Sequence, residues 1–361
     1  MERVYNFSPG SSILPLPVLE QAQRELVSYG NTGTSVMEMS HRTPAYEAII
    51  KGAEKSLRDI MGISDDYAVL FLQGGASLQF AMVPMNLLPA GGVADYADTG
   101  FFAAKAMAEA KKFGSANAVV SSKADNYAYV PEMTQSMLTP GAAYLHITTN
   151  NTIFGTHYPK LPSIGDVPLV ADMSSNILGE EYDVNQFGLV YAGAQKNMGP
   201  AGLTVVIVRK DLLGKAGANV PVMMDYKVMA ENESMYNTPP CWSIYVAGLV
   251  FEWVKTMGGV KSLEAINKEK AGLVYDVLGN SKMFKGTARP DCRSIMNVTF
   301  TLPDEESTGA FVKLCASHGL VNLKGHRAVG GIRASMYNAM PLEGAKALVN
   351  LMKEFEAKGG K

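Results

Sequence analysis

Two apolar runs that read as buried strands flank a short loop with a single lysine, in the stretch LVYAGAQKNMGPAGLTVVIV at residues 189–208. Residues 189–192 and 203–208 are apolar and partly β-branched, which favours strands. Turn chemistry explains the glycines and the proline of the loop. It does not explain Lys196, which two core strands would carry to the end of a sheet. The chain is therefore expected to build a buried sheet that presents a lysine at its strand ends.

Strand-like and helix-like runs alternate along most of the chain, which predicts an α/β fold with a mainly parallel sheet covered by helices on both faces. The 361 residues exceed what one core usually holds, so we expect two domains. The expected large domain comprises residues 16–260. The expected small α+β domain comprises residues 1–15 and 261–361. Strands are expected near 68–72, 93–96, 118–121, 144–148, 168–172 and 296–302. Helices are expected at 44–62, from 78 onward, and at 101–113, 242–257, 263–278, 307–318 and 342–355.

Composition excludes several classes of function. The formal net charge of -2 indicates neither a nucleic-acid surface nor a basic membrane patch. The amino terminus lacks the pattern of a signal peptide, and no apolar run approaches the length of a membrane span. Three widely spaced cysteines show no pairing or metal-site pattern, which is typical of a reducing compartment. The expectation is a cytoplasmic protein without a metal site.

The chemistry of Lys196 depends on its surroundings. A lysine amine forms a Schiff base with an aldehyde only when its environment favours the neutral form, and most lysines are simply solvated. Asp172 ends the apolar run of VPLVADMSS, and a buried carboxylate needs a partner. The protonated pyridine nitrogen of pyridoxal phosphate would be such a partner. A helix cap or an ordinary ion pair would explain Asp172 equally well.

Two further segments have features that suit a phosphate. FLQGGASLQF, at residues 71–80, reads as a strand, a glycine turn and a helix start, which presents free N–H groups and the positive end of a helix dipole. It matches neither GxGxxG nor GxxxxGK[ST]. YNTPP, at residues 236–240, offers the amide of Asn237 and the hydroxyl of Thr238, although both could serve as helix caps.

Taken together, five segments resemble the phosphoserine aminotransferases, a group within the class V family of fold-type-I pyridoxal-phosphate transaminases. The segments are YNFSPGSSILP, VADMSS, YAGAQKNMGPAGLT, YNTPP and GHRAVGGIRASMYNAM, and the resemblance spans essentially the whole chain in the same order. It implies the fold of that family, pyridoxal phosphate as cofactor, and a homodimer with composite active sites.

The resemblance also implies roles for single residues. Lys196 would bond to the cofactor aldehyde, and Asp172 would pair with the pyridine nitrogen. Asn237 and Thr238 would reach the cofactor phosphate from the other subunit. The remaining cofactor contacts would come from Ala76, Ser77, Phe102, Thr152 and Gln195. Two positions depart from the family pattern, since Ser77 replaces an arginine or cysteine and Phe102 replaces a frequent tryptophan.

Paired cations suggest the substrate. His41–Arg42 and His326–Arg327 are two His-Arg pairs, and Arg333 follows the second. Arginine binds carboxylate and phosphate oxygens in a bidentate manner, although either pair alone could be an exposed basic loop. By resemblance, Arg333 would hold the α-carboxylate of the substrate. The other four residues would line the subsite for a distal phosphate or γ-carboxylate, some of them across the dimer.

The implied reaction is a reversible transamination, in which L-glutamate and 3-phosphohydroxypyruvate give 2-oxoglutarate and O-phospho-L-serine, as in serine biosynthesis. The sequence leaves open whether the protein also acts on a related phosphorylated, threonine-type substrate of pyridoxine synthesis. Alternatives within the same fold are an alanine–glyoxylate-type aminotransferase and a cysteine desulfurase, which would need an activated thiolate among Cys241, Cys292 and Cys315. Alternatives of another class are a cofactor-binding module without catalysis and a P-loop-like phosphate-binding protein. The chain has no Walker lysine for the last of these.

Overall fold

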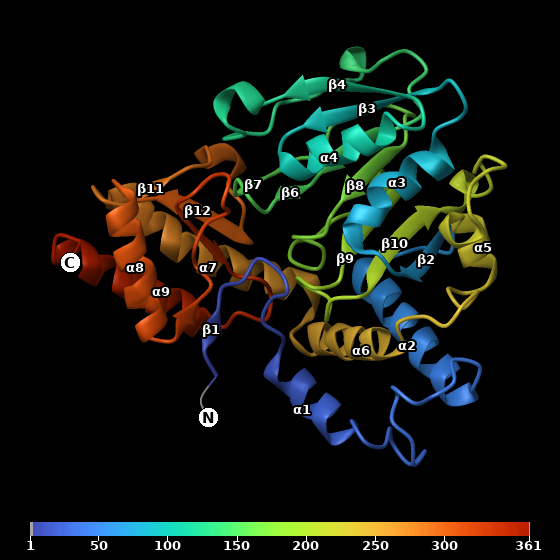
Figure 1. Ribbon diagram of the computed structural model, residues 1–361, viewed down its shortest axis with the longest axis horizontal. Coiled ribbons are helices and arrows are strands. Elements are labelled where there is room, and N and C mark those ends of the chain that lie inside the picture. Colours follow the sequence, from blue (N-terminus) through green and yellow to red (C-terminus); the bar gives the residue numbers. More distant parts are fainter. Residues whose placement is uncertain (1–2, 361) are drawn as a thin grey trace.

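A seven-stranded sheet lies at the centre of the structure, a computed structural model that describes residues 3–360 (Figure 1). Its strands, in spatial order, are β2 (Tyr67–Leu72), β10 (Thr204–Arg209), β9 (Leu189–Gly193), β8 (Leu169–Asp172), β5 (Leu145–Thr148), β3 (Val93–Asp98) and β4 (Ser115–Ser121). The strands from β9 to β4 are parallel, whereas β10 is antiparallel to both β9 and β2. The predicted mainly parallel sheet is confirmed, with β10 as the exception.

The reversal of β10 follows from the loop that precedes it. A parallel crossover needs a dozen or more residues, and the loop from Ala194 to Leu203 is too short for one. The two strands therefore form a hairpin, and the backbone N–H of Ala194 donates to the carbonyl of Leu203 at 3.0 Å. Because β2 is antiparallel to β10, it runs in the same direction as β9.

Helices cover both faces of this sheet, as predicted. Side chains alternate along each strand, so that Val69, Val190 and Ile207 belong to one core and Leu70, Tyr191 and Val206 to another. The first core is covered by α2 (Pro44–Met61) and α6 (Cys241–Thr256), and α1 (Leu16–Arg24) packs beside α6. The second is covered by α3 (Gly75–Leu87), α4 (Phe101–Ala110) and α5 (Tyr226–Glu231).

Helix boundaries follow local chemistry. Thr43 caps α2, because its side chain accepts a hydrogen bond from the N–H of Tyr46, and the helix ends at Gly62 in the left-handed conformation. Helix α3 begins at Gly75 rather than at the predicted Leu78. Gly74 provides the left-handed turn (φ 86°), and a Cβ there would lie 2.5 Å from Leu78 Cδ2.

A third core lies at the left of Figure 1, among the orange and red C-terminal elements. Its helices are α7 (Gly259–Asn280), α8 (Glu305–Ser317) and α9 (Leu342–Ala357). Its main sheet consists of β11 (Lys285–Gly286), β12 (Asn297–Thr301) and β14 (Ile332–Ser335). Near the amino terminus, β1 (Tyr5–Asn6) pairs with β13 (Leu320–Val321), and Phe7 is buried in the same core. The exact limits of the two expected domains stay a prediction.

The remaining strands form a small hairpin that the sequence did not predict. It consists of β6 (Asn150–Asn151) and β7 (Thr156–His157), which pair in antiparallel fashion. The hairpin directly follows β5 and carries Thr152 in its turn. No helix within residues 3–360 is long and apolar enough to cross a membrane.

Candidate active site

A cavity of about 300 Å³ lies where the carboxyl ends of the parallel strands meet. Because β2, β3, β5, β8 and β9 run in one direction, the segments that follow them converge at the same end of the sheet, the usual place for ligands in open α/β sheets. The predicted site residues that line the cavity are Ala76, Ser77, Phe102, Thr152, Asp172, Gln195, Lys196, His326 and Arg333.

Lys196 projects into this cavity from the β9–β10 hairpin. Its amine donates a hydrogen bond of 2.9 Å to Thr152 Oγ1 and lies 5.8 Å from the centre of the Phe102 ring. The amino-terminal segment holds the loop from the other side, because the Ser12 hydroxyl donates to the Lys196 carbonyl at 2.5 Å and the Ser12 N–H donates to the Gln195 carbonyl at 2.9 Å. The backbone that carries the amine is therefore held both by the β9–β10 hairpin and by the hydrogen bonds of Ser12.

The protonation of Lys196 is shifted toward the neutral form. Burial lowers the pKa of its amine from 10.5 to about 8, although the charge of Asp172 acts in the opposite direction. The nearby charge of Arg333 lowers the pKa further. An amine with such a pKa is partly neutral near physiological pH, as a lysine nucleophile requires.

Asp172 lies at the carboxyl end of β8 and is buried. Burial raises the pKa of its carboxyl, while hydrogen bonds from Ser174 and Tyr191 and the charge of Lys196 act against this rise. The Ser174 N–H donates to Asp172 Oδ1 at 2.9 Å. A carboxylate buried in this way is stabilised further by a cationic partner in the cavity.

Tyr191 and His146 extend this arrangement and were missed by the sequence analysis. Tyr191 lies opposite Asp172 in the β8–β9 register, and its hydroxyl is 2.8 Å from His146 Nε2. The ring of Tyr96 stacks on His146 at 5.0 Å, and burial lowers the pKa of His146 to about 3, so the imidazole is neutral. The histidine inside the apolar run 144–148 could have indicated such a contact, because a buried polar side chain usually has a hydrogen-bond partner.

The amino terminus of α3 forms the third side of the cavity. No side chain caps the helix, so the N–H groups of its first turn stay available to a ligand, and Gly75, Ala76 and Ser77 of this turn line the cavity. Together with the helix dipole they suit a phosphate group. Phe102 lines the cavity from α4, and Gly100 precedes this helix where a Cβ would lie 2.6 Å from Asn151 Oδ1.

Arg333 supplies a buried cation to the same cavity from β14. Its side chain is 7% exposed, and its Nε has no hydrogen-bond partner within residues 3–360. Burial lowers the pKa of its guanidinium. A buried, partly unsatisfied guanidinium is costly unless an anion binds it, so this position suits a ligand carboxylate.

Five of the predicted residues do not line this cavity in the single chain: His41, Arg42, Asn237, Thr238 and Arg327. Arg42, Thr238 and Arg327 are exposed, and the other two are half-buried. His41 and Arg42 precede α2, and Asn237 and Thr238 precede α6. Their predicted roles at the cofactor or substrate stay predictions.

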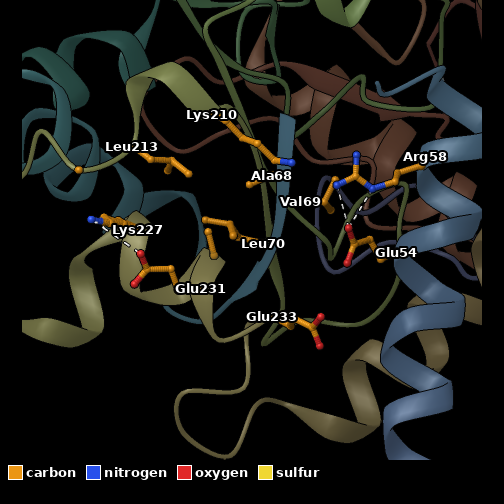
Figure 2. Close-up of a pocket in the computed structure, with 12 residues that line it drawn as sticks. Glu54, Arg58, Ala68, Val69, Leu70, Lys210, Leu213, Lys227, Glu231 and Glu233 are labelled. Carbon is orange, nitrogen blue, oxygen red and sulfur yellow. Dashed lines mark hydrogen bonds and ion pairs between the residues drawn. The ribbon is translucent and has the colours of Figure 1, made fainter. Parts of the chain in front are cut away.

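A larger cavity, of about 630 Å³, lies beside β2 and has different chemistry (Figure 2). Four of its charged residues form ion pairs, since Arg58 pairs with Glu54 at 2.8 Å and Lys227 with Glu231 at 3.7 Å. Size therefore does not identify the functional site. The smaller cavity is distinguished by a shifted lysine, a buried carboxylate and a buried guanidinium without a full set of partners.

The residues of the smaller cavity fit pyridoxal phosphate. The free N–H groups at the start of α3 suit its phosphate, the buried Asp172 suits its pyridine nitrogen, and Phe102 offers an aromatic face for its ring. Lys196, with its lowered pKa, is available to its aldehyde. The volume is at the lower end of the range for small-molecule sites, roughly 300–1,000 Å³.

Comparison with known proteins points to one family. Residues 4–348 match the model of the class-V aminotransferases. The chain is 53% identical to the phosphoserine aminotransferase of Bacillus cereus over 356 residues, which cover 99% of both chains. It is 54% identical to that of Listeria monocytogenes over 364 residues, covering 100% of this chain and 99% of the relative.

Solved structures agree with the sequence relatives. The phosphoserine aminotransferase of Bacillus circulans subsp. alkalophilus superposes with a TM-score of 0.96 at 48% identity, covering 99% of each chain. The phosphoserine aminotransferase of Trichomonas vaginalis, solved with pyridoxal phosphate bound, gives a TM-score of 0.93 at 38% identity and covers 97% of this chain and 100% of that one. Pyridoxal phosphate is the cofactor of this family. The chain belongs to the class-V aminotransferases and, within them, to the phosphoserine aminotransferases.

Proposed function

We propose that this protein transfers the amino group of L-glutamate to 3-phosphohydroxypyruvate, releasing 2-oxoglutarate and O-phospho-L-serine. The observation that carries the proposal is the placement of the buried Arg333 in one cavity with Lys196 and Asp172. Both amino donor and keto acceptor carry an α-carboxylate, which a buried guanidinium binds in a bidentate manner. Their distal anions would be held by His326 and Arg327, together with His41 and Arg42.

Bound pyridoxal phosphate supplies the electron sink that makes the α-proton of an amino acid acidic. The chain's own residues do the rest. Asp172 would hold the pyridine nitrogen in its protonated form, with Ser174 and Tyr191 holding the carboxylate in place. The Lys196 amine would act as the general base that takes the substrate's α-proton and would also deliver that proton. Thr152, 2.9 Å from that amine, orients it.

Cations at the proposed distal subsite would account for a preference for glutamate as the donor. A substrate without a distal anion, such as alanine, would leave the charges of the distal subsite unpaired and is therefore disfavoured. The cysteine desulfurase alternative lacks support, because none of the three cysteines lines the cavity and burial raises the pKa of each thiol. A likeness to an alanine–glyoxylate aminotransferase from Nostoc, with a TM-score of 0.77 at 15% identity, extends to the fold alone.

The proposal includes a two-fold symmetric dimer with composite sites. The segments that carry His41–Arg42 and Asn237–Thr238 also expose large apolar side chains. Met37 is 58% exposed, and Tyr236, next to Asn237, is 45% exposed. Contact between two copies would cover such residues and bring the neighbouring polar groups to the other subunit's cavity. The protein would act in the cytoplasm, where its three free cysteines stay reduced.

A coupled assay tests the function. The purified holoenzyme, given 3-phosphohydroxypyruvate and one amino donor at a time, should release 2-oxoglutarate with glutamate and react far more slowly with alanine. Sulfide release from cysteine should stay at the level of the Lys196→Ala variant. Equal rates with alanine, or sulfide release above that level, would contradict the proposal.

A further inference from the structure

Lys105, on α4, has an unusual environment for an exposed helical lysine. Its ordinary partner would be Glu109, one turn further along the helix. Glu109 instead binds Lys112, whose amine lies 2.8 Å and 2.7 Å from its two carboxylate oxygens. Lys105 forms no ion pair within residues 3–360, and its amine lies 4.8 Å from the centre of the Phe101 ring. The cation is therefore positioned by an aromatic face rather than by a carboxylate.

Phe101 connects this lysine to the candidate active site. Its ring centre lies 5.8 Å from that of His326, which lines the cavity, and 6.2 Å from that of Phe102, which also lines it. Phe101 is 39% exposed although it is large and apolar. Lys105 and His326 thus share one aromatic platform at the rim of the cavity.

The charges around His326 all have the same sign. Besides burial, the charges of Arg333, Arg327 and Lys105 lower the pKa of its imidazole, and among the residues that the structure describes no carboxylate acts on it in the opposite direction. Such an array repels any further cation and is neutralised only by an anion from outside. Lys105 contributes to it from α4, an element that carries none of the predicted anion-binding residues.

We propose that Lys105, held over Phe101, is a specificity-determining residue at the rim of the active site, where it favours the phosphorylated substrate. This inference rests on the proposed function and deepens it. The phosphate carries more negative charge than the γ-carboxylate of glutamate, so an additional cation at the rim discriminates between the two. Because Lys105 is exposed, its effect is moderate and is screened by salt.

The kinetic test uses the holoenzyme and the variant Lys105→Met. We expect kcat/KM for 3-phosphohydroxypyruvate to fall roughly two- to five-fold at low ionic strength, through KM rather than kcat. The loss should be smaller for glutamate and should disappear in high salt. Lys105→Arg should restore the activity, and Phe101→Leu, which removes the platform, should show part of the loss. The matched control is Lys112→Met, on the same segment but paired with Glu109. An effect of Lys105→Met equal to that of the control would overturn the proposal.

A second measurement does not depend on turnover. Lys105→Met should raise the pKa of His326 in an NMR titration of the holoenzyme, with the His326→Gln variant identifying the signal among the five histidines. An unchanged titration would overturn the placement of Lys105 at the rim. Failure of the proposed function would look different, because the wild type would then not turn over 3-phosphohydroxypyruvate, while the His326 titration would still respond to Lys105.

Discussion

The side chain of Asn197 accepts a hydrogen bond of 3.0 Å from the backbone N–H of Asn338. Asn197 directly follows Lys196, and Asn338 lies five residues after Arg333, so this contact joins the segments that carry the lysine and the arginine of the cavity. The side-chain Nδ2 of Asn338 donates to the Leu178 carbonyl at 2.8 Å. Its side-chain Oδ1 accepts a hydrogen bond of 2.8 Å from Asn267 on α7. Buried amide groups thus connect the backbone segments that carry the amine and the guanidinium.

Replacing Asn197 by alanine should therefore destabilise the protein. The Asn338 N–H would stay buried without its acceptor, which typically costs about 1–3 kcal/mol of unfolding free energy. Urea unfolding measures the change, with Asn185→Ala at an exposed position as the control. A loss no larger than that of the control would show that the contact has no energetic role.

Removing the cavity lysine should abolish activity while the fold survives. In the Lys196→Ala variant the same change removes the nucleophile and the proton carrier. Borohydride reduction of the wild-type holoenzyme, followed by peptide mass mapping, should place a pyridoxyl group on Lys196 and on no other lysine. Circular dichroism checks the fold of the variant. Near-normal turnover by Lys196→Ala would refute its assignment.

The lowered pKa of Lys196 predicts the pH dependence of cofactor capture. Below about pH 8 the amine of the cofactor-free protein is protonated and cannot attack an aldehyde, so the rate of pyridoxal phosphate binding should rise with pH and level off above about 8. Asp172→Asn should move the midpoint down, since the Asp172 charge raises the pKa, and Arg333→Gln should move it up. Stopped-flow absorbance at several pH values measures all three proteins. Shifts of opposite sign would contradict the assigned causes.

The lowered pKa of Lys196 also affects the unfolding free energy of the cofactor-free protein. The unfolded chain, with a lysine pKa near 10.5, binds more protons than the folded one between about pH 8 and 10.5. The contribution of Lys196 to the unfolding free energy of the cofactor-free protein therefore becomes more favourable as pH rises through this window.

Arg333 should lower the unfolding free energy of the cofactor-free protein and raise its affinity for substrates. Arg333→Met removes a buried guanidinium whose Nε lacks a partner, so the cofactor-free protein should gain about 1–3 kcal/mol of unfolding free energy. Affinity for glutamate and for 3-phosphohydroxypyruvate should fall together, because both present an α-carboxylate. Thermal unfolding and substrate titration measure the two effects. The exposed Arg289→Met provides the control. Loss of one substrate alone would assign Arg333 to the distal anion instead.

Mixing inactive subunits tests the composite site. A Lys196→Ala subunit and an Arg42→Ala subunit, each inactive alone, should form heterodimers in which one site has its own Lys196 and the partner's Arg42. Random exchange should restore roughly a quarter of the wild-type activity, because about half of the dimers are mixed and each has one intact site. Native mass spectrometry verifies the exchange.

The control for this experiment pairs Lys196→Ala with Asp172→Ala. Both residues line the cavity of one chain, so no heterodimer site is intact and no activity should return. Heterodimers of Lys196→Ala and Arg42→Ala without activity would show that Arg42 acts within its own subunit.

The sequence predicted those parts of the fold that depend on local chemistry. The strands around Lys196 and Asp172 were recognisable from short apolar runs. The start of α2 was recognisable from Thr43 and Pro44, because helix capping depends on residues that are adjacent in the sequence. The start of α3 was placed three residues too late, because the left-handed conformation of Gly74 and its close approach to Leu78 become visible only in the structure.

The parts of the site that depend on distant contacts were less accessible. His146 and Tyr191 lie on different strands and meet only through the sheet register. The sequence does not distinguish Lys105 from other surface lysines, because only the structure shows that its helical neighbour Glu109 binds Lys112 instead. Arg42 and Asn237 could be named from the resemblance, but a single chain does not bring them to the cavity.

The cavity lies between two apolar cores, since Lys196 follows strand β9 of the central sheet and Arg333 lies on β14, in the sheet of the carboxy-terminal core. Each core buries its own set of apolar side chains, and helix α7 connects them, with Val260 and Leu263 in one core and Val274 and Val277 in the other. A ligand that touches both amine and guanidinium therefore binds only when the two cores are intact and in register. Its binding free energy stabilises both cores together, so unfolding of either one should cost more free energy when substrate is present.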